Sequence, residues 1–483
     1  MFRRATPRLA IIAAMLCGTA LPVRAETLQD ALAAAYRDNP TLTAARAGQR
    51  ATDETFNIQK ASGLPDLRAS GSYTETVQQS PYNEFQPRRT LSTALDLTVP
   101  LYQGGRVRNG MRAADTRVDA GQFDLRSTEL TIFSQVVAAY MDVIRGQSVV
   151  GLSRNNVQVL EVNLQATNNR FQVGDLTRTD VAQSESRLAL ARGDLRTAEA
   201  QLIEARERYI QLVGHAPVDL QAPPPLPGLP AAAEDAVDVA LASNPDLAAA
   251  RKEREATLYD VRVARGLRHP SVSAFSSGSY NTDLSSTPGS SGFEQFGEAV
   301  TVGARITLPL YQGGGPGAQV RQSQALEQAA MERETATERD VIAQTRSLYS
   351  SWQASNQVIA SSRVAVDASA LSLRGVRAEN SVGTRTILDI LNAEQENFSA
   401  RVQLVTAERN AYVAAFSLLA SMGQVSPTEL GIAASDVYDP NANYQRVRGK
   451  WFDWDDDATP APISLRTVDS VPQNATVETD VNP

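Results

Sequence analysis

The chain has 483 residues, a net charge of −8 and a single cysteine, Cys17. An acidic composition disfavours nucleic-acid binding, because such binding depends on clustered positive charge. After Cys17 the sequence contains no thiol, so that part of the chain has no residue for a disulfide, a thiolate nucleophile or a cysteine metal site.

The first 25 residues have the pattern of a secretory signal peptide. Arginines at positions 3, 4 and 8 precede an apolar stretch from Leu9 to Leu21, and residues 23–25 (VRA) form a small-x-small cleavage site. Leu16 stands where a lipoprotein would have a small residue before its cysteine, so we expect cleavage after Ala25 and no lipid. Removing the four arginines of this segment from 46 basic residues leaves 42 against 54 acidic residues, a net charge of −12.

The rest of the chain contains two copies of one pattern. The run 98–105 (TVPLYQGG) recurs as 307–314 (TLPLYQGG), 209 residues later, and Asn39-Pro40 recurs as Asn244-Pro245, 205 residues later. Several matches in the same order indicate an internal duplication. We expect a first repeat over residues 26–221, a proline-rich linker over 222–230, a second repeat over 231–434 and a polar, acidic, partly disordered tail over 435–483. Trp451, Phe452 and Trp454 are expected to dock this tail on the helical body.

Each repeat is expected to open with a helical segment, over residues 28–61 and 236–265, followed by two strands. Residues 91–99 and 300–308 alternate between apolar and polar side chains. This period of 2 predicts strands with one apolar and one polar face, and Asp96 and Arg305 belong to the polar face. An ordinary half-buried soluble sheet has the same pattern. If the strands lie in lipid, several chains must share one barrel, because four strands cannot close and an open edge is not tolerated there.

Two very long helices are predicted next. Residues 106–172 and 318–381 form stretches of 67 and 64 residues, and the first would be about 100 Å long at 1.5 Å per residue. The shorter segments 27–61 and 175–213 together reach a similar length. Two short helices stacked end to end are therefore expected to pair antiparallel with each long helix. A soluble coiled-coil bundle would have the same periodicity.

Two runs near the helix ends resemble a known family motif. Residues 382–394 (VGTRTILDILNAE) and 171–181 (FQVGDLTRTDV) resemble the periplasmic tip motif of the TolC family, and the two PLYQGG runs resemble its strand-to-helix passage. The resemblance covers about residues 27 to 430. It implies a mainly α homotrimer in which four strands per chain form a twelve-stranded outer-membrane β-barrel, continued into the periplasm by a coiled-coil tunnel. It also implies a periplasmic adaptor and an inner-membrane transporter of the RND or ABC type as partners.

The candidate gate lies at the two helical tips, whose turns contain Gly174 and Gly383. Asp180 and Asp389 each lie six residues past these glycines, so a trimer would place up to six carboxylates at one height. Crowded like charges would raise some of their pKa values and attract cations. Thr177 with Asp180, and Thr386 with Asp389, equally fit a helix capping box.

The resemblance assigns further roles at these tips. It implies that Asp389 lines the closed entrance, where the next family acid is replaced by Asn392. It also implies that Arg385 contacts Thr179 and Asp180 of a neighbouring coiled coil and holds the tube shut. A tyrosine of that network is replaced by Asn380. The expected hinges between strands and helices are Pro65, Pro100, Gly104, Gly105, Pro270, Pro309, Gly313 and Gly314.

Catalytic chemistry has little support in the sequence. His215 and His269 are the only histidines, and each lies beside a proline at the end of an expected element. The glycine run 313–317 lacks the GK[ST] ending of a phosphate-binding loop. The family resemblance implies a passive exit duct of an efflux pump or type I secretion system, and we expect no enzymatic activity, cofactor or metal. The alternatives are a soluble periplasmic coiled-coil scaffold or adaptor and, third, an exported hydrolase.

Overall fold

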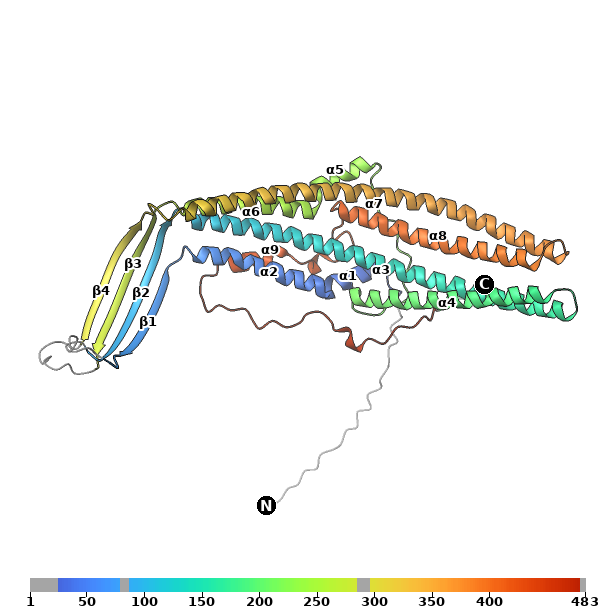
Figure 1. Ribbon diagram of the computed structural model, residues 1–483, viewed down its shortest axis with the longest axis horizontal. Helices are drawn as coiled ribbons and strands as arrows, with labels where there is room; N and C mark the ends of the chain where they lie inside the picture. Colours follow the sequence, from blue (N-terminus) through green and yellow to red (C-terminus); the bar gives the residue numbers. More distant parts are fainter. Residues whose placement is uncertain (1–24, 79–86, 285–295, 478–483) are drawn as a thin grey trace, which may run out of the picture.

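A computed structural model describes residues 25–78, 87–284 and 296–477. The molecule is elongated, with a four-stranded sheet at one end and long helices running away from it (Figure 1). The expected signal peptide lies outside the described residues, except for Ala25. In the described part of the chain, no helix combines the length and apolar character needed to cross a membrane.

The order of the elements repeats along the chain. The first set is α1 (Leu28–Asp38), α2 (Pro40–Ala61), β1 (Asp66–Glu75), β2 (Arg89–Gln103), α3 (Arg106–Gln172) and α4 (Arg178–Val213). The second set is α5 (Ala233–Ser243), α6 (Pro245–Gly266), β3 (Ser271–Asp283), β4 (Phe296–Thr307), α7 (Gly315–Ser381) and α8 (Ile387–Ser421). The short helices η2 (Ala434–Asp436), α9 (Pro440–Arg448) and η3 (Thr467–Asp469) follow.

The long helices agree with the sequence prediction. Both α3 and α7 have 67 residues, and each ends at the predicted residue, Gln172 or Ser381, but α7 begins at Gly315, three residues before its predicted start. Helix α3 packs against α2 and α4, and α7 packs against α6 and α8. Each long helix is thus paired with two shorter ones, as the segment lengths predict. Helix α6 also packs against α3 and thereby joins the two repeats.

The expected single opening helix of each repeat is in fact two helices. The break falls at Asn39-Pro40 and again at Asn244-Pro245, because a residue before proline avoids the helical region and proline is favoured at the first helical position. Asn39 is extended and its side chain accepts a hydrogen bond from the backbone N–H of Thr41 at 2.9 Å. The same amide donates to the carbonyl oxygen of Leu212 at 2.9 Å, which ties the break to the end of α4.

The four strands form one antiparallel sheet in the order β1-β2-β3-β4, and the β2–β3 pair joins the two repeats. Asp96 is opposite Ser277, which is opposite Thr301, so Asp96 and Arg305 lie on the same face, as period 2 predicts. The alternate face is apolar and uncovered in the single chain. Its Val302 and Ile306 side chains are 77% and 72% exposed. Apolar side chains exposed to this extent indicate contact with lipid or another chain.

The strand-to-helix hinges depend on glycine. Gly104 and Gly105 have φ of 63° and 76°, and Gly313 and Gly314 have φ of 60° and 79°, a left-handed region that glycine enters without strain. A Cβ atom at Gly104 would overlap the carbonyl oxygen of Gly266 at the end of α6, whereas one at Gly313 would meet no atom within 4 Å.

The expected proline hinges do not all lie between elements. Pro65 and Pro270 directly precede β1 and β3, and Pro309 lies between β4 and α7. Pro100 is a correction, because it lies inside β2, next to a register shift between Pro100 and Tyr102. A bulge is one of the few places where a strand accommodates a residue without an N–H.

The expected docking of the tail through its aromatic residues is wrong. Trp451, Phe452 and Trp454 are 77%, 63% and 83% exposed. The tail is instead held by α9, where Tyr444 and Val447 are buried against the helical body. Beyond α9 the chain runs back along the helices (Figure 1), and residues 478–483 lie outside the described part.

Candidate functional site at the helical tips

The two tips have the same backbone geometry. Gly174 and Gly383 both have φ of 82°, and each lies two residues after the end of its long helix, α3 or α7. In each turn a backbone N–H reaches back to the end of the long helix, from Asp175 to the carbonyl oxygen of Arg170 at 2.9 Å and from Thr384 to that of Glu379 at 3.0 Å. These are the contacts by which a left-handed glycine closes a helix C-terminus.

Capping boxes follow both turns. The Asp180 carboxylate accepts hydrogen bonds from the backbone N–H and the hydroxyl of Thr177 at 2.9 and 2.7 Å, and the Thr177 hydroxyl accepts one from the Asp180 N–H at 3.3 Å. Thr386 and Asp389 repeat this arrangement at 2.9, 2.7 and 3.3 Å. The helix capping boxes, which the sequence offered as an alternative role for the two acids, are therefore present within one chain.

These hydrogen bonds set the charge state of the two acids. The Thr177 backbone N–H, and then its hydroxyl, lower the pKa of Asp180 below its usual value. The Thr386 hydroxyl, followed by its backbone N–H, lowers the pKa of Asp389. Within one chain the shift is thus opposite to that expected from crowded carboxylates. Both tips hold ionised acids at neutral pH.

Near the tips, two hydrogen bonds connect the α3–α4 hairpin to the α7–α8 hairpin; farther from the tips, Arg409 on α8 also pairs with Asp142 on α3 at 2.9 Å. Arg187 on α4 donates through Nη2 to Oδ1 of Asn392 on α8 at 2.9 Å. Nearer the turns, Arg170 donates through Nη1 to Oδ1 of Asn380 at 3.5 Å. Both asparagines stand where the family resemblance implies other side chains. Arg187 and Arg170 were missed by the sequence analysis, because neither belongs to a motif and their repeat counterparts, Glu396 and Glu379, have the opposite charge.

Arg385 makes its ion pair within its own hairpin. Its Nε lies 2.8 Å from Oε2 of Glu379, and its carbonyl oxygen accepts a hydrogen bond from Asn380 at 2.7 Å. The described contacts of the single chain do not join Arg385 to Thr179 or Asp180. Such a link, if made, must run between chains.

The polar face of the sheet holds the other predicted pair. Oδ1 of Asp96 accepts a hydrogen bond from Ser277 at 2.6 Å, and the Arg305 guanidinium lies 5.2 Å from the centre of the Phe275 ring. Each is therefore engaged with a neighbouring strand rather than with the other.

The histidines form no metal site. His215 lies 3.6 Å from the buried Glu26 carboxylate, which also accepts a hydrogen bond from Tyr209 at 2.5 Å. Among the described residues, no group of three or more histidine, cysteine, aspartate or glutamate side chains could hold a metal ion.

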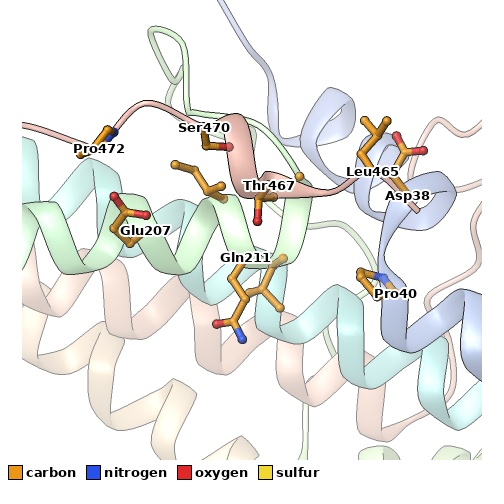
Figure 2. A pocket seen from close by; sticks show the side chains of 11 residues that line it. Asp38, Pro40, Glu207, Gln211, Leu465, Thr467, Ser470 and Pro472 are labelled. Carbon is orange, nitrogen blue, oxygen red and sulfur yellow. The ribbon is translucent and has the colours of Figure 1, made fainter. Parts of the chain in front are cut away.

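A pocket far from the tips lies between α4 and the tail. Glu207 and Gln211 of α4 line it together with Thr467, Ser470 and Pro472 of the tail (Figure 2). The Glu207 carboxylate accepts a hydrogen bond from the backbone N–H of Gln473 at 3.0 Å. Glu207 therefore helps to hold the tail against α4, and the pocket is the space left between the tail and the helices.

Comparisons with known proteins agree with this architecture. The sequence profile of the family described as outer membrane efflux protein matches residues 31–215 and 236–424. The chain is 33% identical over 453 residues to the outer membrane efflux protein BepC of Brucella suis biovar 1 (strain 1330), covering 93% of this chain and 97% of BepC. It is 25% identical over 436 residues to the outer membrane protein TolC of Escherichia coli (strain K12), covering 87% of each.

Solved structures show the same fold. The CmeC outer membrane channel of Campylobacter jejuni matches with a TM-score of 0.73 at 16% identity, over 87% of this chain and 89% of that one. CusC matches with a TM-score of 0.70 at 19% identity, over 82% and 92% of the two chains. The expected mainly α fold with four strands per chain, and the outer-membrane location, are confirmed. The chain belongs to the outer membrane efflux protein family and is an outer-membrane exit channel of the TolC type.

Proposed function

We propose that three copies of the chain form one duct, with a twelve-stranded barrel in the outer membrane and a helical tunnel in the periplasm. The observation that carries this proposal is the incomplete sheet. Strands β1 and β4 each pair on one side within the chain, and the apolar face beside them is exposed. Lipid tolerates neither open edge, because unpaired backbone groups are costly there.

The duplication indicates how the copies join. Within the chain, β2 and α3 of the first repeat contact β3 and α6 of the second. The equivalent surfaces are β4 and α7 on one side and β1 and α2 on the other. If they meet in the same way, the ring closes with six similar interfaces. Gly104 and Gly313 are equivalent positions of the two repeats. Gly104 is in close contact with the end of α6, whereas the space around Gly313 is open, as expected if α2 of a neighbouring copy lies there in the assembly.

A cross-linking experiment tests this register. Asp96 on β2 is opposite Ser277 on β3. The repeat equivalent of Asp96 is Arg305, 209 residues later, and that of Ser277 is Ser72, 205 residues earlier. Arg305 of one copy should therefore be opposite Ser72 of the next. The sequence contains no cysteine after Cys17, so Arg305→Cys with Ser72→Cys introduces the two thiols of the expected mature chain. Oxidation should give a reducible species of three chains, because opposite residues have Cα atoms about 5 Å apart.

Arg305→Cys with Ser70→Cys is the matched control. It moves one thiol two residues along β1, about 7 Å away, so its cross-linking should be much weaker. Equal cross-linking of both pairs, or of neither, would contradict the proposed register.

We propose further that the tips form the gate. Asp180, Asp389 and Asn392 would surround the periplasmic entrance, and Arg385 would link to Thr179 and Asp180 of a neighbouring chain. The hydrogen bonds between the two hairpins support this proposal, because opening requires the hairpins to separate. Asp96 and Arg305 would face the water-filled lumen of the barrel.

The partners follow from the same proposal. A duct without an energy source needs a periplasmic adaptor and an inner-membrane transporter of the RND or ABC type, and it needs no cofactor or enzymatic activity of its own. Co-purification after cross-linking in cells would identify the partners. Recovery of the chain without any inner-membrane transporter would contradict this part of the proposal.

A further inference from the structure

We propose that residues 450–457, called here the aromatic loop, anchor the protein to the periplasmic leaflet of the outer membrane through Trp451, Phe452 and Trp454. The inference rests on the proposed function, since it requires the sheet to lie in that membrane. These side chains are 77%, 63% and 83% exposed. Exposed aromatic side chains gathered on one short loop indicate a binding surface.

Helix α9 fixes the position of the loop. Asn57 and Lys60 near the end of α2 donate hydrogen bonds to the carbonyl oxygens of Val447 and Arg448 at 2.8 and 3.0 Å. The Tyr444 ring packs edge-on against Phe56, with ring centres 5.8 Å apart. The chain therefore leaves α9 at a defined place, at the end of the helical body that faces the sheet (Figure 1).

Ion pairs close the loop at its base. Lys450 lies 3.3 Å from Asp455, and Arg446 donates two hydrogen bonds of 2.8 Å to the Asp457 carboxylate. Arg446 and Lys450 hold the pKa of Asp457 at about 2, so the pairs persist at neutral pH. Within the loop the Trp451 and Phe452 rings pack edge-on, 6.4 Å apart. Because the base is closed, the aromatic side chains are presented together.

The loop lies at the level where the sheet ends. Arg448 lines the same pocket as Leu101 and Tyr102, the last apolar residues of β2. Trp451 follows Arg448 by three residues, so its Cα atom lies at most about 11 Å from that of Arg448, even in a fully extended chain. Leu101 and Tyr102 are themselves 62% and 48% exposed. The aromatic loop thus begins close to the apolar end of β2, at the edge of the sheet nearest the helices.

A lipid interface fits this surface better than a protein partner. Tryptophan is enriched at membrane interfaces, where its ring is buried and its N–H remains hydrated. The loop carries Lys450 and four acids, at positions 453 and 455–457. This excess of negative charge disfavours anionic lipids. The expected occupant is therefore the headgroup region of a zwitterionic phospholipid layer.

Tryptophan fluorescence tests the proposal directly. The chain has three tryptophans, so Trp352→Phe leaves only the two of the loop. This variant is reconstituted into phosphatidylethanolamine vesicles that contain phosphatidylcholine brominated near the headgroup or deep in the acyl chain. We expect shallow bromine to lower the emission about twofold and deep bromine to lower it less, because interfacial tryptophan lies near the headgroups.

The matched control is Trp451→Phe with Trp454→Phe, which leaves Trp352 alone. Trp352 lies in α7, 37 residues from its first residue Gly315, or about 55 Å along the helix, so brominated lipid should not quench it.

Conductance is recorded on the same vesicles. Conducting protein whose loop is quenched by aqueous iodide and not by bromine overturns the anchor alone. Conducting protein quenched by neither indicates that protein covers the loop, which also overturns it. Failure to insert or conduct overturns the proposed function and the anchor together.

Discussion

Removing the side-chain acceptor at Asn392 should make the channel leak. The Arg187–Asn392 hydrogen bond of 2.9 Å joins the two helical hairpins near their tips. It is exposed, so its contribution is about 0.5–1 kcal/mol rather than the larger value of a buried charged bond. Three copies acting in one gate would contribute about 1.5–3 kcal/mol, and since 1.4 kcal/mol is tenfold, Asn392→Ala should raise the open probability about 10- to 150-fold.

The assay is single-channel recording of Asn392→Ala and wild type in planar bilayers. Glu161→Gln is the matched control, because it breaks the Arg192–Glu161 ion pair of 2.7 Å, which joins α3 to α4 within one hairpin. The control should keep the wild-type open probability. An unchanged open probability in Asn392→Ala, or an equal rise in both variants, would refute the idea that contacts between hairpins hold the channel closed.

Four other predictions follow from the described contacts. Charge reversal by Arg385→Glu places a second acid beside Glu379 and should raise leak conductance; an unchanged leak argues against Arg385 as a closing residue. Gly104→Ala should lower the free energy of unfolding by about 2–5 kcal/mol, measured as a lower guanidinium midpoint, because of left-handed strain and overlap with Gly266. In a monomer dissociated by detergent, Gly313→Ala should lower the free energy of unfolding by less, because no atom lies near its added Cβ. Tyr209→Phe removes a donor from the buried Glu26 carboxylate and should cost about 1–3 kcal/mol by the same measurement; a neutral change contradicts this. Because the pKa values of Asp180 and Asp389 are lowered on folding, their stabilisation of the tips is present above the unfolded pKa of about 4 and is lost as pH falls through the folded values. The protection factors of the tip amides, which are the intrinsic exchange rates at each pH divided by the observed rates, should therefore be constant between about pH 8 and 5, and a loss of protection in that range would contradict the assigned shift.

The repeats, the long helices and the tip turns could be predicted because each depends on local sequence. Helices without proline, period-2 strands and paired glycines give the same signal whatever surrounds them. The break at Asn39-Pro40 was predictable from proline geometry, but the sequence analysis used this pair only as a marker of the repeat. The exposed positions of Trp451 and Trp454 were not predictable, because burial depends on what lies opposite a side chain and not on its own hydrophobicity.

The hydrogen bonds at the tips show the same limit. Each capping box lies within four consecutive residues, so the sequence alone identified both boxes as an alternative role for Asp180 and Asp389. Arg187 and Asn392 lie 205 residues apart, on different hairpins, and only the packing of α4 beside α8 brings them together. Contacts of this kind require the tertiary structure.

Single-channel recording of the detergent-purified protein in planar bilayers, with its mass measured by light scattering, tests the central claim most directly. The proposed duct predicts a mass of three chains and small, cation-preferring openings, because the ionised Asp180 and Asp389 would surround a narrow entrance. A monomer without conductance would contradict the shared barrel.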